Sequence, residues 1–186
     1  VINAVFHNRA LIALILMTLF SISAYNIKTQ IVVYYCKYNL KNANLVSYVN
    51  FFTIGCSVIG VSFLPKLVKT FGKKKTAVMV FLISAVSDAA NFLIPGTHFV
   101  AFIILATISF MSLSIANGVT WAFVSDTIDY GEWKNGERRE GITYSAFNLS
   151  RKIAQAIAGS TAGFGLTLVG YVANANQSSS TLLGIK

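Results

Sequence analysis

Residues 99–124 read FVAFIILATISFMSLSIANGVTWAFV, a run that contains no charged side chain. A hydrocarbon layer of about 30 Å is crossed by roughly 20 helical residues, so this run is long enough to span a membrane. Over the whole chain 55% of the residues are apolar and 11% are charged, whereas soluble domains carry charged residues at about 25%. The composition therefore predicts membrane helices rather than a water-soluble domain.

Hydropathy predicts four further membrane spans on either side of this run. They cover about residues 11–35, 45–64, 76–94 and 142–172. The last is the longest and the least apolar. We predict that residues 1–186 form one all-α, polytopic membrane unit with five transmembrane helices.

The formal net charge of +9 is concentrated between the spans. Positive residues that share one side of the membrane in this arrangement are Arg9, Lys66, Lys69, Lys73, Lys74, Lys75, Lys134, Arg138 and Arg139. The positive-inside rule then places Val1 and these loops in the cytoplasm. A nucleic-acid partner is not expected, because a nucleic-acid-binding protein displays its basic residues on a soluble fold. Cys36 and Cys56 are interpreted as packing residues, and no metal site or cofactor is expected.

Residues 126–141 read DTIDYGEWKNGERREG and hold five of the six acids of the chain. Asp126 and Asp129 are three residues apart and share a helix face, and Arg138 follows closely enough to fold back on them. The stretch is interpreted either as a solvated loop or as a cytoplasmic gate of ion pairs. The gate residues would be Asp126, Asp129, Glu132, Arg138 and Arg139.

The fifth span carries Arg151 and Lys152 about ten residues from its start, roughly 15 Å deep. A charge at such depth costs at least about 2.5 kcal/mol, so it usually faces a polar cavity or a partner; snorkelling along a tilted helix is the alternative. If Lys152 faces a cavity, polar residues within two turns share its face and suit a sugar. The candidate cavity residues are Tyr144, Ser145, Asn148, Arg151, Lys152 and Gln155. Trp121 is a further candidate, which either offers its ring face to a sugar ring or lies at the lipid–water interface.

Three other features of the spans have a structural interpretation. Gly159 and Gly163, flanked by alanines, predict close approach of a neighbouring helix. Asp88, with Ser84 and Asn91 on its face, favours a structural hydrogen-bonding role over a functional one. Lys28 either reaches outer water or lines the cavity.

The motif DTIDYGEWKNGERREGITYSAF at 126–147, with RKIAQAIAGS at 151–160 and GYVANANQ at 170–177, resembles the glycoside-pentoside-hexuronide:cation symporters of the major facilitator superfamily. The resemblance implies that the five spans correspond to helices seven to eleven, and that helix twelve and the amino-terminal half are absent from this sequence. By position Lys152 matches a family lysine near the cation and sugar sites, whereas Arg151 matches a basic residue in only part of the family. Trp121 matches the tryptophan of a Pro-Trp-Ala segment in which Thr120 replaces the proline.

The resemblance further implies secondary active transport of a sugar or glycoside in a bacterial inner membrane. The expected partners are the sugar, a monovalent cation (Na+ or H+) bound mainly by the amino-terminal half, that half itself and the lipid bilayer. A membrane sugar sensor or a uniporter on the same fold is the alternative. An enzyme is not expected, because no nucleophile with a base, acid pair or metal-ligand spacing converges within the spans.

Overall fold

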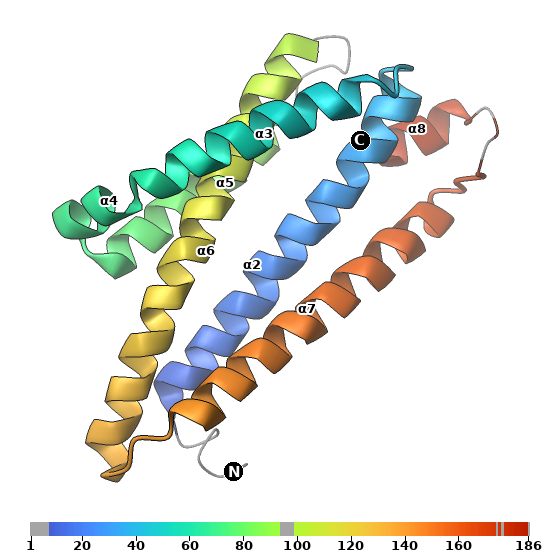
Figure 1. Cartoon of the computed structure of the whole chain (residues 1–186). Coiled ribbons are helices and arrows are strands. Elements are labelled where there is room, and N and C mark those ends of the chain that lie inside the picture. The colour runs from blue at the N-terminus through green and yellow to red at the C-terminus, as the bar shows by residue number, and fades with distance from the viewer. Residues whose placement is uncertain (1–7, 94–98, 174, 176, 186) are drawn as a thin grey trace.

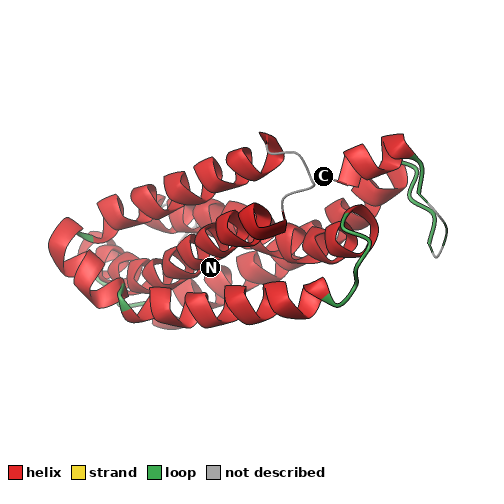
Figure 2. Cartoon of the chain, turned by 90° about the horizontal axis from the view of Figure 1, so that it is seen from above, coloured by secondary structure: helices red, strands yellow, loops and turns green. Residues whose placement is uncertain are grey.

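The computed structural model describes residues 8–93, 99–173, 175 and 177–185. These residues form helices and connecting turns, and none of them is in a β-strand (Figure 2). In chain order the helices are α2 (Arg9–Tyr34), the π-helical turn η1 (Tyr35–Asn39), α3 (Leu45–Ser62), α4 (Leu64–Phe71), α5 (Lys73–Leu93), α6 (Phe99–Asn135), α7 (Glu140–Leu168) and α8 (Ser179–Ile185). The predicted all-α fold is confirmed. Val1 and Ile94 lie outside the described residues.

In the described part of the chain, four helical stretches are long and apolar enough to cross a membrane: Arg9–Asn39, Leu45–Ser62, Lys73–Leu93 and Phe99–Asn135. They correspond to the first four predicted spans. The fifth, α7, has the length to cross but is less apolar than these four. Length and composition among the described residues therefore support four of the five predicted spans, and α7 is not one of these four.

Two helices do not end where the predicted spans end. The fourth span was expected to end near Val124, but α6 continues through the acidic stretch to Asn135, and the chain first turns at Gly136, where φ is 72°. The second span was expected to end at Leu64, but α3 ends at Ser62 and the short helix α4 follows. Pro65 lies in the first turn of α4, where its missing N–H leaves no unmade helical hydrogen bond.

The helices pack around α2 and α6 (Figure 1). Helix α6 lies between α3 and α5, whereas α7 runs along α2 and makes few contacts with α6. Leu11, Leu14, Val124, Ile128 and Phe147 form a buried cluster that joins α2, α6 and α7. A second cluster of Ala77, Val80, Ile115, Ala116 and Val119 joins α5 to α6.

Large apolar side chains cover much of the outer surface, among them Phe51, Leu93 and Leu168. Several buried hydroxyls instead donate hydrogen bonds to carbonyls of their own helix, as Thr18 Oγ1 does to the Leu14 oxygen (2.7 Å) and Thr120 Oγ1 to the Ala116 oxygen (2.9 Å). Apolar residues outside and satisfied hydroxyls inside are what a lipid environment requires. The fold is therefore that of a multi-pass membrane protein.

Candidate functional site

Helix α7 presents three different faces. Thr143, Phe147, Ser150, Ala154, Ala158 and Ala162 are buried, and Ser23 of α2 donates a hydrogen bond to the Ala154 oxygen (3.1 Å). An apolar face with Leu149, Ile153, Ile157, Phe164 and Leu168 is exposed. The remaining face is polar, and all the predicted cavity residues except Trp121 of α6 lie on it.

Lys152 lies on the side of α7 that points away from α2. It is two residues from the buried Ala154, and two residues correspond to a rotation of about 200° around a helix. Lys152, Ser145, Asn148 and Gln155 are all exposed. Within the described part of the chain, no hydrogen bond or ion pair engages these four side chains, so their polar groups are available to another molecule or to another part of the protein.

Arg151, Trp121 and Phe147 are brought together between α6 and α7. The guanidinium carbon of Arg151 lies 5.2 Å from the Trp121 ring centroid and 5.7 Å from that of Phe147. The two rings are themselves T-shaped, with centroids 5.0 Å apart. Separations below about 6 Å are those of cation–π contacts. Trp121 thus holds Arg151 at the edge of the polar face of α7.

No described residue makes the close approach expected at Gly159 and Gly163. A Cβ atom at either glycine would meet nothing within 4 Å. The alanines of the buried face make the contact with α2 instead. The two glycines extend the exposed side on which Lys152 lies, and a stripe of small residues there would admit a closely packed helix.

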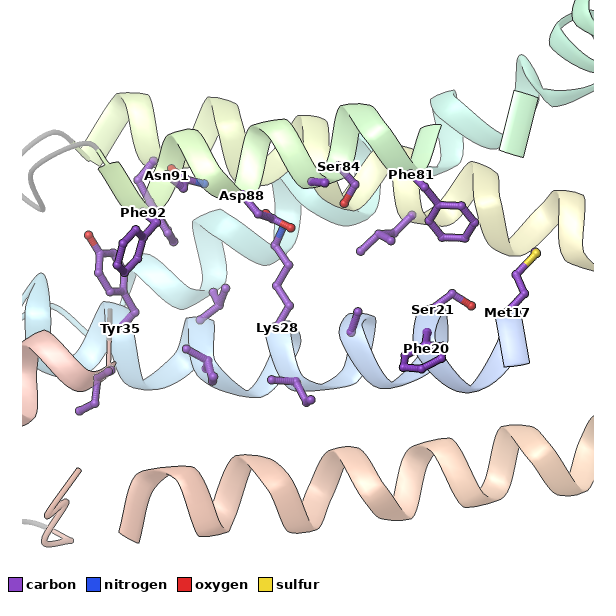
Figure 3. Close-up of a pocket in the computed structure, with 18 residues that line it drawn as sticks. Met17, Phe20, Ser21, Lys28, Tyr35, Phe81, Ser84, Asp88, Asn91 and Phe92 are labelled. Carbon is purple, nitrogen blue, oxygen red and sulfur yellow. The ribbon is translucent and has the colours of Figure 1, made fainter. Parts of the chain in front are cut away.

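Lys28 and Asp88 form an ion pair that sequence reasoning did not find (Figure 3). Lys28 extends from α2 to α5, and its ammonium nitrogen also lies 4.6 Å from the Phe110 ring centroid. The side chains are 17% and 43% exposed. The expected structural role of Asp88 thus has a specific partner, and Lys28 lies on the side of α2 away from α7 in Figure 3. The signal available in the sequence was that two opposite charges occur inside spans that are otherwise almost uncharged.

The ion pair borders a cavity of about 690 Å³ between α2 and α5. Ser84 and Asn91 line the same cavity, as their shared helix face predicts, and the Ser84 hydroxyl is hydrogen-bonded to that of Ser109 (2.8 Å). A second cavity of about 490 Å³ lies between α2, α3 and α6, and its polar lining includes Thr29, Asn50 and Ser114. None of the predicted cavity residues of α7 lines either space.

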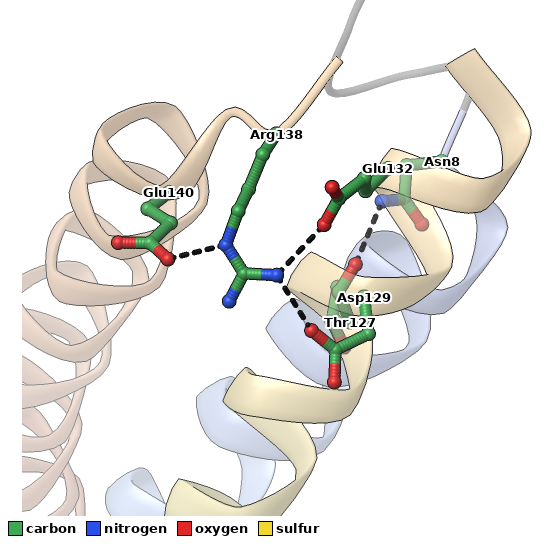
Figure 4. A network of polar contacts seen from close by, with 6 residues as sticks. All are labelled: Asn8, Thr127, Asp129, Glu132, Arg138 and Glu140. Atoms are coloured by element: carbon green, nitrogen blue, oxygen red, sulfur yellow. Dashed lines mark hydrogen bonds and ion pairs between the residues drawn. The ribbon is translucent and has the colours of Figure 1, made fainter. Parts of the chain in front are cut away.

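The predicted gate residues form three separate groups. Arg138 Nη1 donates hydrogen bonds to Asp129 (3.0 Å) and Glu132 (2.7 Å), and its Nε donates to Glu140 (2.6 Å), which joins the end of α6 to the start of α7 (Figure 4). These hydrogen bonds to carboxylates raise the pKa of Arg138 above its ordinary value, so the guanidinium stays charged. Arg138 therefore folds back on Asp129, as predicted.

The expectation that Arg138 would also reach Asp126 was wrong. Asp126 accepts a hydrogen bond from Lys73 of α5 instead (2.6 Å), because the continuation of α6 carries Asp126 away from the loop and alongside the first turn of α5. Arg139 pairs with Glu137 within the connecting loop (2.6 Å). Among the described residues there is no group of three or more His, Cys, Asp or Glu side chains that could hold a metal.

Comparison with known proteins identifies the family. A family model described as MFS/sugar transport protein matches residues 1–186. The chain belongs to this family. It is 55% identical over 186 residues to the uncharacterized symporter YjmB of Bacillus subtilis (strain 168). It is 44% identical over 183 residues to a putative sulfoquinovose importer of Salmonella typhimurium, and 38% identical over 134 residues to the glucuronide carrier protein homolog of Escherichia coli (strain K12).

These matches cover 100%, 98% and 70% of this chain but 40%, 38% and 28% of the three relatives. The chain thus spans well under half the length of the transport proteins that it matches. The resemblance to sugar symporters noted in the sequence is confirmed, and the family is one of transport proteins rather than enzymes.

Proposed function

We propose that this chain is the carboxy-terminal part of a symporter that couples the movement of a sugar or glycoside to a monovalent cation, Na+ or H+. The observation that carries the proposal is the polar face of α7. Lys152 lies twelve residues after the start of this helix, about 18 Å along it, on a side that α2 does not cover. An unpaired ammonium group near the middle of a membrane helix is stable when it faces a polar cavity or a partner.

The partner of this face is the amino-terminal half of the same transporter. Tyr144, Ser145, Asn148 and Gln155 would line one wall of a passage between the two halves, with Lys152 near its middle. Halves that rock about such a site give alternating access. The carboxylates that bind the cation would belong mainly to the amino-terminal half, and Lys152 would lie near them.

The substrate class that best fits this wall is a sugar that carries a negative charge. Arg151 and Lys152 place two positive charges side by side, and the chain has no acid on the polar face of α7 to offset them. Hydroxyl and amide side chains nearby suit the hydroxyls of the sugar ring. Two of the relatives are named for sulfoquinovose and for a glucuronide, which are both acidic sugars.

The proposal also includes an orientation. Lys73 contacts Asp126, and Arg138 joins the end of α6 to the start of α7, so the basic connections α4–α5 and α6–α7 lie at the same end of the helices. The positive-inside rule assigns this end to the cytoplasm of a bacterial inner membrane.

The test is transport by the complete protein in proteoliposomes with an imposed H+ or Na+ gradient. Labelled sulfoquinovose and a labelled glucuronide would be compared with a neutral xyloside. We expect accumulation of an acidic sugar above its external concentration, and collapse of that accumulation when an ionophore removes the gradient. Equilibration without accumulation would indicate a uniporter, and binding without movement would indicate a sensor.

Variants of the complete protein test the assigned wall. Lys152→Gln should abolish gradient-driven accumulation, whereas Lys37→Gln, at the opposite end of the helices, should leave it intact. Arg151→Gln should raise the KM for the acidic sugar more than the KM for the neutral one. Normal accumulation by Lys152→Gln would remove this residue from the site.

A further inference from the structure

Helix α4 and the first turn of α5 form a basic surface at one end of the bundle. The chain places Lys66 and Lys69 on α4, turns at Gly72 (φ 79°) and places Lys73, Lys74 and Lys75 at the start of α5. Five lysines thus occur within ten residues, and residues 66–75 contain no acid. This surface is called the α4–α5 basic surface below.

The short helix α4 is strongly two-sided. Leu64, Leu67 and Val68 pack against the buried cluster that joins α5 to α6. Lys66 and Lys69 lie on the opposite side and are exposed. Phe63 and Phe71, at the two ends of α4, are 54% and 44% exposed. Apolar rings beside lysines are the arrangement of a segment that lies at a membrane surface, with its rings at the level of the lipid headgroups.

Only one of the five lysines has an acidic partner among the described residues. Lys73 pairs with Asp126 (2.6 Å), so these two charges offset each other. Lys66, Lys69, Lys74 and Lys75 are exposed, and no hydrogen bond or ion pair joins them to the described part of the protein. The Lys73–Asp126 contact joins the start of α5 to α6. The four remaining lysines therefore lie on or next to a segment that is packed against the rest of the protein.

We propose that the α4–α5 basic surface binds the headgroups of anionic phospholipids in the surrounding bilayer. Four uncompensated lysines next to two membrane-spanning helices match the pattern that attracts acidic lipid, each lysine strengthening binding by about fivefold. The acids at this end of the helices are already engaged: Asp126 pairs with Lys73, Arg138 pairs with Asp129, Glu132 and Glu140, and Arg139 pairs with Glu137. The binding site is separate from the polar face of α7 and does not depend on which substrate is transported.

The experiment measures lipid binding by the complete transporter in neutral detergent. Its thermal unfolding midpoint is followed while phosphatidylglycerol or, in a parallel series, phosphatidylcholine is added. We expect phosphatidylglycerol to raise the midpoint at a lower concentration than phosphatidylcholine does. Added salt should weaken this difference, and inorganic phosphate alone should not reproduce it, because the site requires a headgroup fixed at the membrane surface.

Variants locate the effect. Joint replacement Lys66→Gln, Lys69→Gln, Lys74→Gln and Lys75→Gln should raise the phosphatidylglycerol concentration for half of the effect by at least about tenfold. Joint replacement of the same four lysines by Arg should keep the wild-type response, which separates lost charge from damaged folding. Lys37→Gln with Lys41→Gln, a pair of exposed lysines at the opposite end of α2, should respond as the wild type does. An unchanged response in the four-Gln protein, or an equal loss in the Lys37 and Lys41 variant, would overturn the proposal.

Discussion

Lys28 of α2 and Asp88 of α5 pair across the wall of a cavity, and the Lys28 ammonium group also lies 4.6 Å from the Phe110 ring of α6. One side chain therefore ties three helices together on the side of α2 that α7 does not cover. A charge in a membrane helix is stable when it has such a partner. The pair supports the α2–α5–α6 packing rather than the polar face of α7.

Asp88→Asn and Lys28→Met should each destabilise the protein, because each leaves the other charge without its partner. The loss should be about 1–3 kcal/mol, less than for a fully buried pair because Asp88 is 43% exposed. The double variant should lose less than the sum of the two single losses. Thermal unfolding in detergent measures this double-mutant cycle, and strictly additive losses would show that the pair contributes nothing.

Arg138 and Arg139 provide a matched comparison for the proposed gate. Arg138 contacts carboxylates at the end of α6 and the start of α7, whereas Arg139 contacts Glu137 within the loop. In the complete transporter, Arg138→Glu should change the turnover rate more than the apparent affinity for sugar, because it breaks the ion pairs that join the end of α6 to the start of α7.

Arg139→Gln is the control and should leave both kinetic constants near wild type. Substrate-dependent initial rates in proteoliposomes give the two constants separately. If the two variants had the same turnover rate and the same apparent affinity, residues 126–141 would be an ordinary solvated connection and not a gate.

Gly60 should be the most sensitive glycine of α3. A Cβ atom at Gly60 would overlap the Met111 side chain of α6, whereas one at Gly55 would meet nothing within 4 Å. Gly60→Ala should therefore destabilise the protein by about 1–3 kcal/mol through overpacking. Gly55→Ala should be neutral or stabilising, since alanine favours a helix over glycine by up to about 1 kcal/mol. Thermal unfolding of the two variants decides this, and a tolerated Gly60→Ala would mean that α3 and α6 pack less closely.

The proposed orientation predicts which cysteines react from outside intact cells. In a background where Cys36 and Cys56 are replaced by Ser, Lys74→Cys should be protected from a membrane-impermeant maleimide, and Lys41→Cys should react. Both positions are exposed in the structure, so access depends on the side of the membrane rather than on burial. The reverse labelling pattern would invert the topology.

The sequence alone was sufficient for the helical membrane fold, because the length and hydropathy of a span are local properties of the chain. Residues 99–124 predict a membrane helix whatever their neighbours are, since the lipid requires every backbone group to be bonded within the helix. The acidic motif at 126–147 was likewise sufficient for the family resemblance. Helix ends were less accurate, because hydropathy does not count the polar residues 125–135 as part of a span, whereas α6 continues through them to Asn135.

Only the tertiary structure decided which side chains meet. Lys28 and Asp88 are 60 residues apart in sequence, and their pairing follows from the way α2 and α5 pack on α6. The same packing buries Ala154 against α2 and consequently turns Lys152 outward, where no other described residue contacts its charge. Periodicity places residues on one face of a helix, but the neighbouring helices determine whether that face lies against protein, lipid or a passage for substrate.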